Sequence, residues 1–314
     1  MRGTASITIP VLTCALLGSM ACAVALGSVS PGTLATLPNA WMIIWDVRIP
    51  RVITAALVGC ALAVAGTAMQ GLFRNPMADP YIIGTSSGGA LGATVAIVLF
   101  AGAGRPILAF VGAMAATFAV YFIARKGGKI PVETLLLSGV ALSTLLSALL
   151  SFLMYTAGRD LHQIMFWLMG GFGNISWNDV IIALPILIGC IAVYFFARDV
   201  NILALNEEDA IHLGVNVERL KQILLALSAF LAGTAVSVAG SIGFIGLITP
   251  HVMRLIVGPD HRILFPAAAL AGAILLVWSD TLTRTFTNSM PVGIITACFG
   301  APFFIYLLRS RMRA

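Results

Sequence analysis

Charged side chains are the groups in this sequence that could do chemistry, and they are few. The 314 residues include 18 Lys and Arg, 12 Asp and Glu and 4 His, so charged residues make up 10% of the chain. Their richest cluster lies at 205–219, where Asn206 precedes three consecutive acids and Gly214 follows. Asn is a preferred helix N-cap, acids in a first turn complement the helix dipole, and Gly commonly ends a helix. We predict two short helices that meet at Gly214, the second starting near Asn216, and a docking element for a soluble partner rather than an ordinary solvated loop.

Motifs for catalysis and energy conversion are absent from the sequence. The Gly128-Lys129 pair lacks the upstream Gly and the following Ser or Thr of a phosphate-binding loop, so this chain is not expected to hydrolyse ATP. Neither HExxH nor GxSxG occurs, and the histidines are dispersed. We predict no catalytic residue, no metal site and no cofactor in this chain. Without CxxC spacing, buried and inert thiols are expected for the cysteines, which all lie in apolar runs: Cys14, Cys22, Cys60, Cys190 and Cys298.

The elements that must position these charges are membrane helices. Apolar residues make up 60% of the chain and the mean hydropathy is +1.02, which excludes a soluble enzyme, a disordered chain and an anchor carrying a large soluble domain. A helix of about 20 apolar residues spans a bilayer. We predict an all-α polytopic membrane protein, one domain over 1–314, with a short outer-surface helix at 161–172. About ten transmembrane helices are expected, at 7–28, 51–71, 81–101, 106–125, 134–156, 178–198, 220–238, 241–257, 264–284 and 291–309.

The basic residues indicate the orientation of these spans. With a cytoplasmic N-terminus, thirteen Lys and Arg fall on the cytoplasmic side and five on the outer side: Arg48, Arg51, Arg105, Arg159 and Arg284. The positive-inside rule therefore predicts that both termini are cytoplasmic. The first apolar run is longer than the core of a signal peptide, which predicts an uncleaved span in the cytoplasmic (inner) membrane. Because the basic residues are separated by apolar runs, the net charge of +6 does not indicate nucleic-acid binding.

Two further groups of charges lie near span ends. Arg48, Arg51 and Arg284 could hold the carboxylates of an acidic partner through bidentate pairs, or could snorkel at the membrane interface; both interpretations are open. Asp280 and Arg254 are the best candidates for ion coupling, yet their positions favour a paired charge near the interface over a proton relay. The energy for transport is then expected to come from another chain.

Five ordered segments carry a resemblance to a known family. They lie at 48–51 (RIPR), 74–80 (RNPMADP), 166–173 (FWLMGGFG), 243–251 (GFIGLITPH) and 291–302 (PVGIITACFGAP). Over nearly its whole length the chain resembles the FecCD-type permeases of bacterial and archaeal ABC importers for iron–siderophores, haem and vitamin B12. Met77 stands where that family usually has Leu.

The resemblance implies the partners and the site residues. It implies a homodimer of ten-span subunits, two copies of a separate ATPase that binds ATP and magnesium, and a periplasmic or surface-tethered substrate-binding protein. Arg48, Arg51 and Arg284 look like the arginines that meet acidic residues of that binding protein. Cytoplasmic gate residues are implied at Asn75, Met77, Val132 and Glu133. Residues that couple to the ATPase are implied at Asn206, Glu207, Glu208, Asp209, His212, Leu213, Gly214, Glu218 and Arg219.

We therefore expect the permease subunit of a binding-protein-dependent importer, not an enzyme. It is expected to move an iron chelate (siderophore or haem) or a corrinoid (vitamin B12) across the lipid bilayer. A self-sufficient secondary transporter or channel is the alternative, and the missing intramembrane acids and the elaborate 205–219 segment argue against it. A membrane-embedded enzyme is disfavoured because no nucleophile–base or metal set can be assembled.

Overall fold

The chain folds as a layered bundle of helices in the computed structural model, which describes residues 2–27, 29, 31–286 and 290–311. In these residues every regular element is a helix, and the one β-bridge, Lys126–Lys129, closes a tight turn. Their bounds, in chain order, are α1 Arg2–Ala25, α2 Pro31–Thr36, α3 Ala40–Met42, the π-helix η1 Ile43–Arg48, α4 Ile49–Leu72, α5 Thr85–Phe100, α6 Arg105–Ala124, α7 Val132–Thr156, the 3-10 turn η2 Gly158–Asp160, α8 Leu161–Leu168, α9 Trp177–Ala183, α10 Pro185–Phe195, α11 Ala197–Leu203, α12 Glu207–His212, α13 Val217–Ala239, α14 Ile245–Val257, α15 His261–Phe286 and α16 Val292–Arg311.

The predicted all-helical membrane fold is confirmed, and each predicted span contains a helix. Among the described residues, seven helices are long and apolar enough to cross a membrane: Ile7–Ala25, Ala40–Leu72, Arg105–Ala124, Val132–Thr156, Trp177–Phe195, Val217–Ala239 and His261–Phe286. Three further apolar helices, Thr85–Phe100, Ile245–Val257 and Val292–Ile305, are shorter than a full span. The total of ten spans and the cytoplasmic placement of the termini therefore stay predictions.

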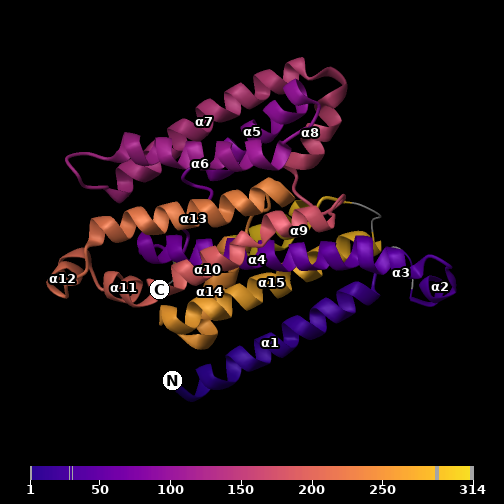
Figure 1. The fold of residues 1–314 in the computed structure, drawn as a ribbon. Coiled ribbons are helices and arrows are strands. Elements are labelled where there is room, and N and C mark those ends of the chain that lie inside the picture. The colour runs from indigo at the N-terminus through magenta and orange to yellow at the C-terminus, as the bar shows by residue number, and fades with distance from the viewer. Residues whose placement is uncertain (1, 28, 30, 287–289, 312–314) are drawn as a thin grey trace.

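Helix α4 forms the centre of the bundle, and it packs against α13, α15, α14 and α10 (Figure 1). Helices α15 and α14 come closest to α4 at glycines. A Cβ at Gly59 would lie 2.3 Å from the carbonyl oxygen of Gly272 in α15, and a Cβ at Gly66 would lie 2.0 Å from the carbonyl oxygen of Gly246 in α14. Small residues allow membrane helices to approach backbone to backbone, where dispersion contacts hold them together. The bundle is thus built around a helix that is buried almost throughout.

The two ends of the bundle carry different elements. Figure 1 shows α11 and α12 at the end where α1 begins, with α2 and α3 at the opposite end. The start of α16 lies near α8, because the amide of Gly293 donates to the carbonyl of Gly170 (3.3 Å). By the predicted orientation, the α12 end is cytoplasmic and the α2–α3 end is outer.

The prediction that all five cysteines are buried is wrong. Cys14, Cys22 and Cys298 are exposed, and Cys60 and Cys190 are half-buried with their sulfur atoms 3.6 Å apart. In a membrane protein apolar residues also cover the helix faces that contact lipid or another subunit, so a place in an apolar run does not imply burial.

Candidate functional site: two ends of a transport path

The segment at 205–219 forms the two helices that its sequence predicts. The Asn206 side chain accepts a hydrogen bond from the Asp209 amide (2.6 Å), and the Asn216 side chain accepts one from the Arg219 amide (3.0 Å). Gly214 has a φ of 84°, a left-handed conformation that suits glycine, and it separates α12 from α13. Local capping therefore determines both the start and the end of this unit.

The side chains of this unit divide into an inner and an outer set. Glu207 and Glu218 turn inward to Lys221, whereas Glu208, Asp209 and His212 are exposed. Three apolar side chains are also exposed, with exposed fractions of 65%, 61% and 61%: Leu205, Ile211 and Leu213. Leu205 and Ile211 do not belong to the predicted coupling residues. Of the apolar residues on this surface, the prediction included only Leu213.

Lys221 is a third residue that sequence reasoning missed. It is 4% exposed, and its ammonium group lies 3.0 Å from Glu207 Oε2, 3.2 Å from Glu218 Oε1 and 3.4 Å from the carbonyl oxygen of Ile130. The spacing of Glu218 and Lys221, three residues apart at the start of a helix, is the signal that could have indicated part of this cluster.

The predicted gate residues lie on two segments near this cluster. Asn75 and Met77 belong to the turn after α4, where the Asn75 side chain accepts from the Met77 amide (3.0 Å). Val132 and Glu133 form the first turn of α7. In the part of the chain that the structure describes, no hydrogen bond or ion pair joins these two pairs directly. Their role as gates is a prediction that the geometry leaves untested.

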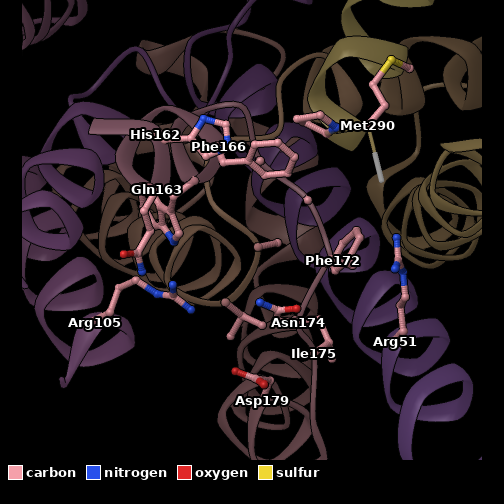
Figure 2. Close-up of a pocket in the computed structure, with 17 residues that line it drawn as sticks. Arg51, Arg105, His162, Gln163, Phe166, Phe172, Asn174, Ile175, Asp179 and Met290 are labelled. Atoms are coloured by element: carbon pink, nitrogen blue, oxygen red, sulfur yellow. The ribbon is translucent and has the colours of Figure 1, made fainter. Parts of the chain in front are cut away.

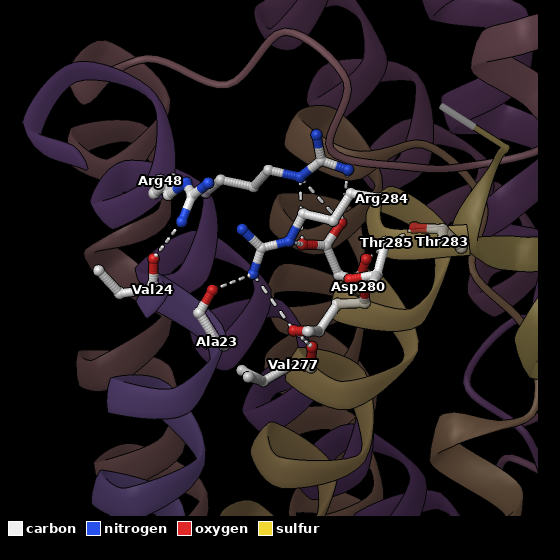
Figure 3. Close-up of polar contacts among 10 residues, drawn as sticks. Ala23, Val24, Arg48, Val277, Asp280, Thr283, Arg284 and Thr285 are labelled. Carbon is white, nitrogen blue, oxygen red and sulfur yellow. Dashed lines mark hydrogen bonds and ion pairs between the residues drawn. The ribbon is translucent and has the colours of Figure 1, made fainter. Parts of the chain in front are cut away.

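The three outer arginines contact acceptors of their own chain. Arg48 donates to the carbonyls of Val24, Ala25 and Val29 at 2.7–2.9 Å, at the end of α1. Arg284 donates to the carbonyl of Ala23 (2.6 Å), as Figure 3 shows. Arg48 and Arg284 are 4% and 6% exposed, so they do not form an open basic rim in this conformation.

The carboxylate of Asp280 forms ion pairs with two of these arginines. Arg51 holds it in a bidentate pair, in which Nη2 donates to Oδ1 (2.8 Å) and Nε donates to Oδ2 (3.1 Å). Arg284 Nε lies 3.3 Å from Oδ2 (Figure 3). The prediction of a paired charge is confirmed for Asp280. Arg254, by contrast, donates to the amide oxygen of Gln70 (3.1 Å).

A cavity of about 420 Å³ opens beside this cluster, between α8, the 170–175 loop and the starts of α4 and α6 (Figure 2). Two guanidinium groups, Arg51 and Arg105, border it. The rest of its wall combines polar, aromatic and aliphatic side chains, among them His162, Gln163, Phe166, Trp167, Phe172, Asn174, Ile175, Asp179, Val238 and Met290. Arg105 Nε and Trp167 Nε1 are buried donors without a hydrogen-bond partner among the described residues. Such a wall suits a ligand that carries acceptor oxygens and a flat or apolar body.

Comparison with known proteins identifies the family. The model of the FecCD transport family matches residues 9–310. The chain belongs to the FecCD transport family. The cobalamin import permease BtuC of Halobacterium salinarum is 51% identical over 87% of this chain and 75% of its own length. The hemin transport permease HmuU of Yersinia pestis is 43% identical over 91% of this chain and 92% of its own length.

A solved structure agrees with this assignment. An inward-facing metal-chelate type ABC transporter superposes with a TM-score of 0.89 at 34% identity, covering 96% of this chain and 98% of that chain. The chain is therefore a multi-pass permease of the cytoplasmic membrane and a transport subunit of an ABC importer, not itself an enzyme.

Proposed function

We propose that this permease works as a homodimer driven by two copies of a separate ATPase, which binds ATP and magnesium. The proposal rests on the segment of residues 205–219, which contains α12 and the start of α13 and is called the α12 unit. It is capped at both ends, and it exposes Leu205, Ile211 and Leu213 beside the carboxylates of Glu208 and Asp209. A mixed apolar and acidic tip at the end of a membrane bundle suits a groove on a soluble partner.

Reconstitution tests this proposal. Permease, ATPase and binding protein are combined in proteoliposomes, and uptake is expected only with ATP and with the ATPase present. Replacing both Ile211 and Leu213 with Ser should remove the ATPase from the purified complex, while Leu37→Ser, an exposed apolar position at the opposite end, should not. Uptake that continues without the ATPase, driven by an ion gradient, would establish the alternative, a secondary transporter or channel.

The cavity supports the proposed cargo, a metal chelate that carries acidic groups or a corrinoid. Arg51 and Arg105 can pair with carboxylate or phosphate oxygens, and Phe166 and Trp167 supply apolar area for a conjugated ring. The cavity lies at the end opposite α12, where the cargo would arrive from a periplasmic or surface-tethered binding protein. Movement of α12 would then open the segments of Asn75 and Met77 and of Val132 and Glu133 on the cytoplasmic side.

The binding protein is proposed to dock at the end that carries Arg48, Arg51 and Arg284. Arg48 and Arg284 contact internal carbonyls, and Arg51, on the cavity border, pairs with Asp280. The test uses Arg51, and the thermal unfolding midpoint of the variant is measured beside its affinity to separate docking from stability. Arg51→Gln should weaken docking at low salt and change the salt dependence, measured with the immobilised binding protein. Arg159→Gln, an exposed outer arginine, is the control. Equal affinity of Arg51→Gln and the wild type at low salt would refute a docking role for Arg51.

A further inference from the structure

We infer that Lys221 is the positioning residue that transmits movement of α12 to both gate segments. This inference rests on the proposed ATPase coupling. Lys221 lies near the start of α13, directly beside α12, and its side chain is only 5% exposed. A lysine buried in this way needs acceptors, and those it finds belong to different segments of the chain.

The first link runs from Lys221 to α12. Its Nζ donates to Glu207 Oε2 at 3.0 Å, and Glu207 is the first residue of α12. A helix of six residues has little stability of its own, so its position depends on tertiary contacts. This ion pair and the buried Ala210 are such contacts.

The second link runs from Lys221 to the segment before α7. Lys221 Nζ donates to the carbonyl of Ile130 (3.4 Å), and Glu218, which also pairs with Lys221, accepts from the amide of Ile130 (2.8 Å). Both backbone groups of Ile130 are thus held by α13 side chains, and its own side chain is 1% exposed. Val132, a predicted gate residue, lies two positions further on.

The third link reaches the turn after α4. The other oxygen of Glu207, Oε1, lies 3.9 Å from a guanidinium nitrogen of Arg74. Arg74 has a φ of 48°, in the left-handed region, and it directly precedes Asn75. Through Glu207, the Lys221 cluster therefore joins α12 to the segment of Asn75 and Met77 as well.

Stability alone does not account for this arrangement. An apolar side chain of similar volume often replaces a buried ion pair at no cost in stability. What an apolar residue cannot supply is directional contact with two other segments, α12 and the segment before α7, together with Glu218 of its own helix. An ammonium group has three donors, and here they match one carbonyl and two carboxylates.

The test compares Lys221→Met, which keeps the length of the side chain, with Lys221→Arg, which keeps the charge. Lys126→Met, an exposed lysine in the turn that leads to Ile130, is the matched control. Each variant is reconstituted with the ATPase and the binding protein, and the haemin or cobalamin imported per ATP hydrolysed is measured, whichever of the two the wild type imports. Wild-type uptake that needs no ATPase would overturn the proposed function itself, before any variant is compared.

Lys221→Met is expected to retain the ATPase in the complex and to lower the import per ATP at least tenfold, whereas Lys221→Arg should recover half or more. Lys126→Met should match the wild type. In hydrogen exchange, ATP should alter both α12 and 126–131 in the wild type but only α12 in Lys221→Met. Import per ATP within twofold of the wild type, or a loss of ATPase binding that Lys221→Arg does not reverse, would overturn the inference.

Discussion

Buried charges in this permease combine partners that are near in the sequence with partners that are far away. Asp280 is 0% exposed; Arg51 donates hydrogen bonds to both of its oxygens, and Arg284 Nε forms an ion pair with Oδ2 at 3.3 Å. Removing one member of such a group leaves the others buried without compensation. The cluster ties the start of α4 to the end of α15, and Arg284 extends it to α1 through Ala23.

Replacing Asp280 with Ala should therefore destabilise the fold by about 3–5 kcal/mol, because two guanidinium groups lose their shared carboxylate in a buried site. The measurement is the thermal unfolding midpoint of the detergent-solubilised permease. Asp160→Ala, an exposed acid near the same end, serves as the control and should leave the midpoint unchanged. Equal midpoints for the two variants would contradict the structural role of Asp280.

Asp79 makes stability depend on pH. Burial raises the pKa of its carboxyl from 3.8 to about 6, and the hydrogen bond from the Tyr81 amide (2.8 Å) opposes part of this rise. Since the folded-state pKa lies above the unfolded value, the folded chain binds this proton more tightly than the unfolded chain does between about pH 3.8 and pH 6. The contribution of Asp79 to stability is thus greatest below about pH 4, and it falls as the pH rises through about 6.

Asp79→Asn should accordingly be more stable than the wild type at pH 7.5 and lose that advantage towards pH 4. Thermal unfolding midpoints of both proteins across this range provide the measurement, and the difference between them isolates Asp79 from other titrating groups. A difference that stays constant with pH would show that the carboxyl titrates at its ordinary value.

At the scale of elements, the approach of α4 to α14 and α15 depends on glycine. A side chain at Gly66 would push its Cβ against the Gly246 carbonyl oxygen at 2.0 Å, a distance that real contacts never reach. Backbone atoms cannot rotate away as the end of a flexible side chain can, so the two helices must separate. The same applies to Gly59 against Gly272.

Gly66→Ala is expected to cost about 1–3 kcal/mol of stability through overpacking. Gly18→Ala in α1, where no atom lies within 4 Å of the added Cβ, should stay within about 0.5 kcal/mol of the wild type. Unfolding midpoints of the two variants, measured side by side, check both values. If the two alanines have the same effect, the close approach of α4 and α14 does not limit stability.

At the scale of the whole molecule, the outer cavity and the α12 unit lie at opposite ends of one helical bundle (Figures 1 and 2). This separation suits the proposed importer, in which the cargo would enter at one end and the ATPase would bind at the other. At the outer end, the buried Nε of Arg105 has no hydrogen-bond partner among the described residues, so it could donate to an acceptor oxygen of the proposed cargo.

Arg105→Gln should therefore reduce uptake of an anionic chelate such as haemin by about tenfold. A hydrogen bond to a charged group contributes about 1.5–3 kcal/mol, and about 1.4 kcal/mol corresponds to a factor of ten. Uptake by proteoliposomes is measured, with Arg159→Gln as the control for general outer charge. Equal uptake by the two variants would exclude Arg105 from the cargo path.

The local features of this protein follow from its sequence by itself. The helices, their approximate ends and the caps at Asn206, Gly214 and Asn216 depend on apolar runs and on contacts over three or four residues, so they could be predicted. The ordered motifs also indicated the family correctly. Burial could not be predicted, because an apolar residue of a membrane helix can face either the protein or its surroundings.

Only the tertiary structure decided which charges from distant parts of the chain meet. Arg51 and Asp280 are 229 residues apart and Lys221 and Ile130 are 91 apart, and no local pattern connects such positions. The arginines expected on an open rim thus proved to hold the chain's own carbonyls and a buried carboxylate, and two of the acids expected at the docking surface turn inward to Lys221. A scarce charge in an apolar bundle pairs with whichever partner the packing of helices brings within reach, because leaving it buried and unpaired costs more than any local preference.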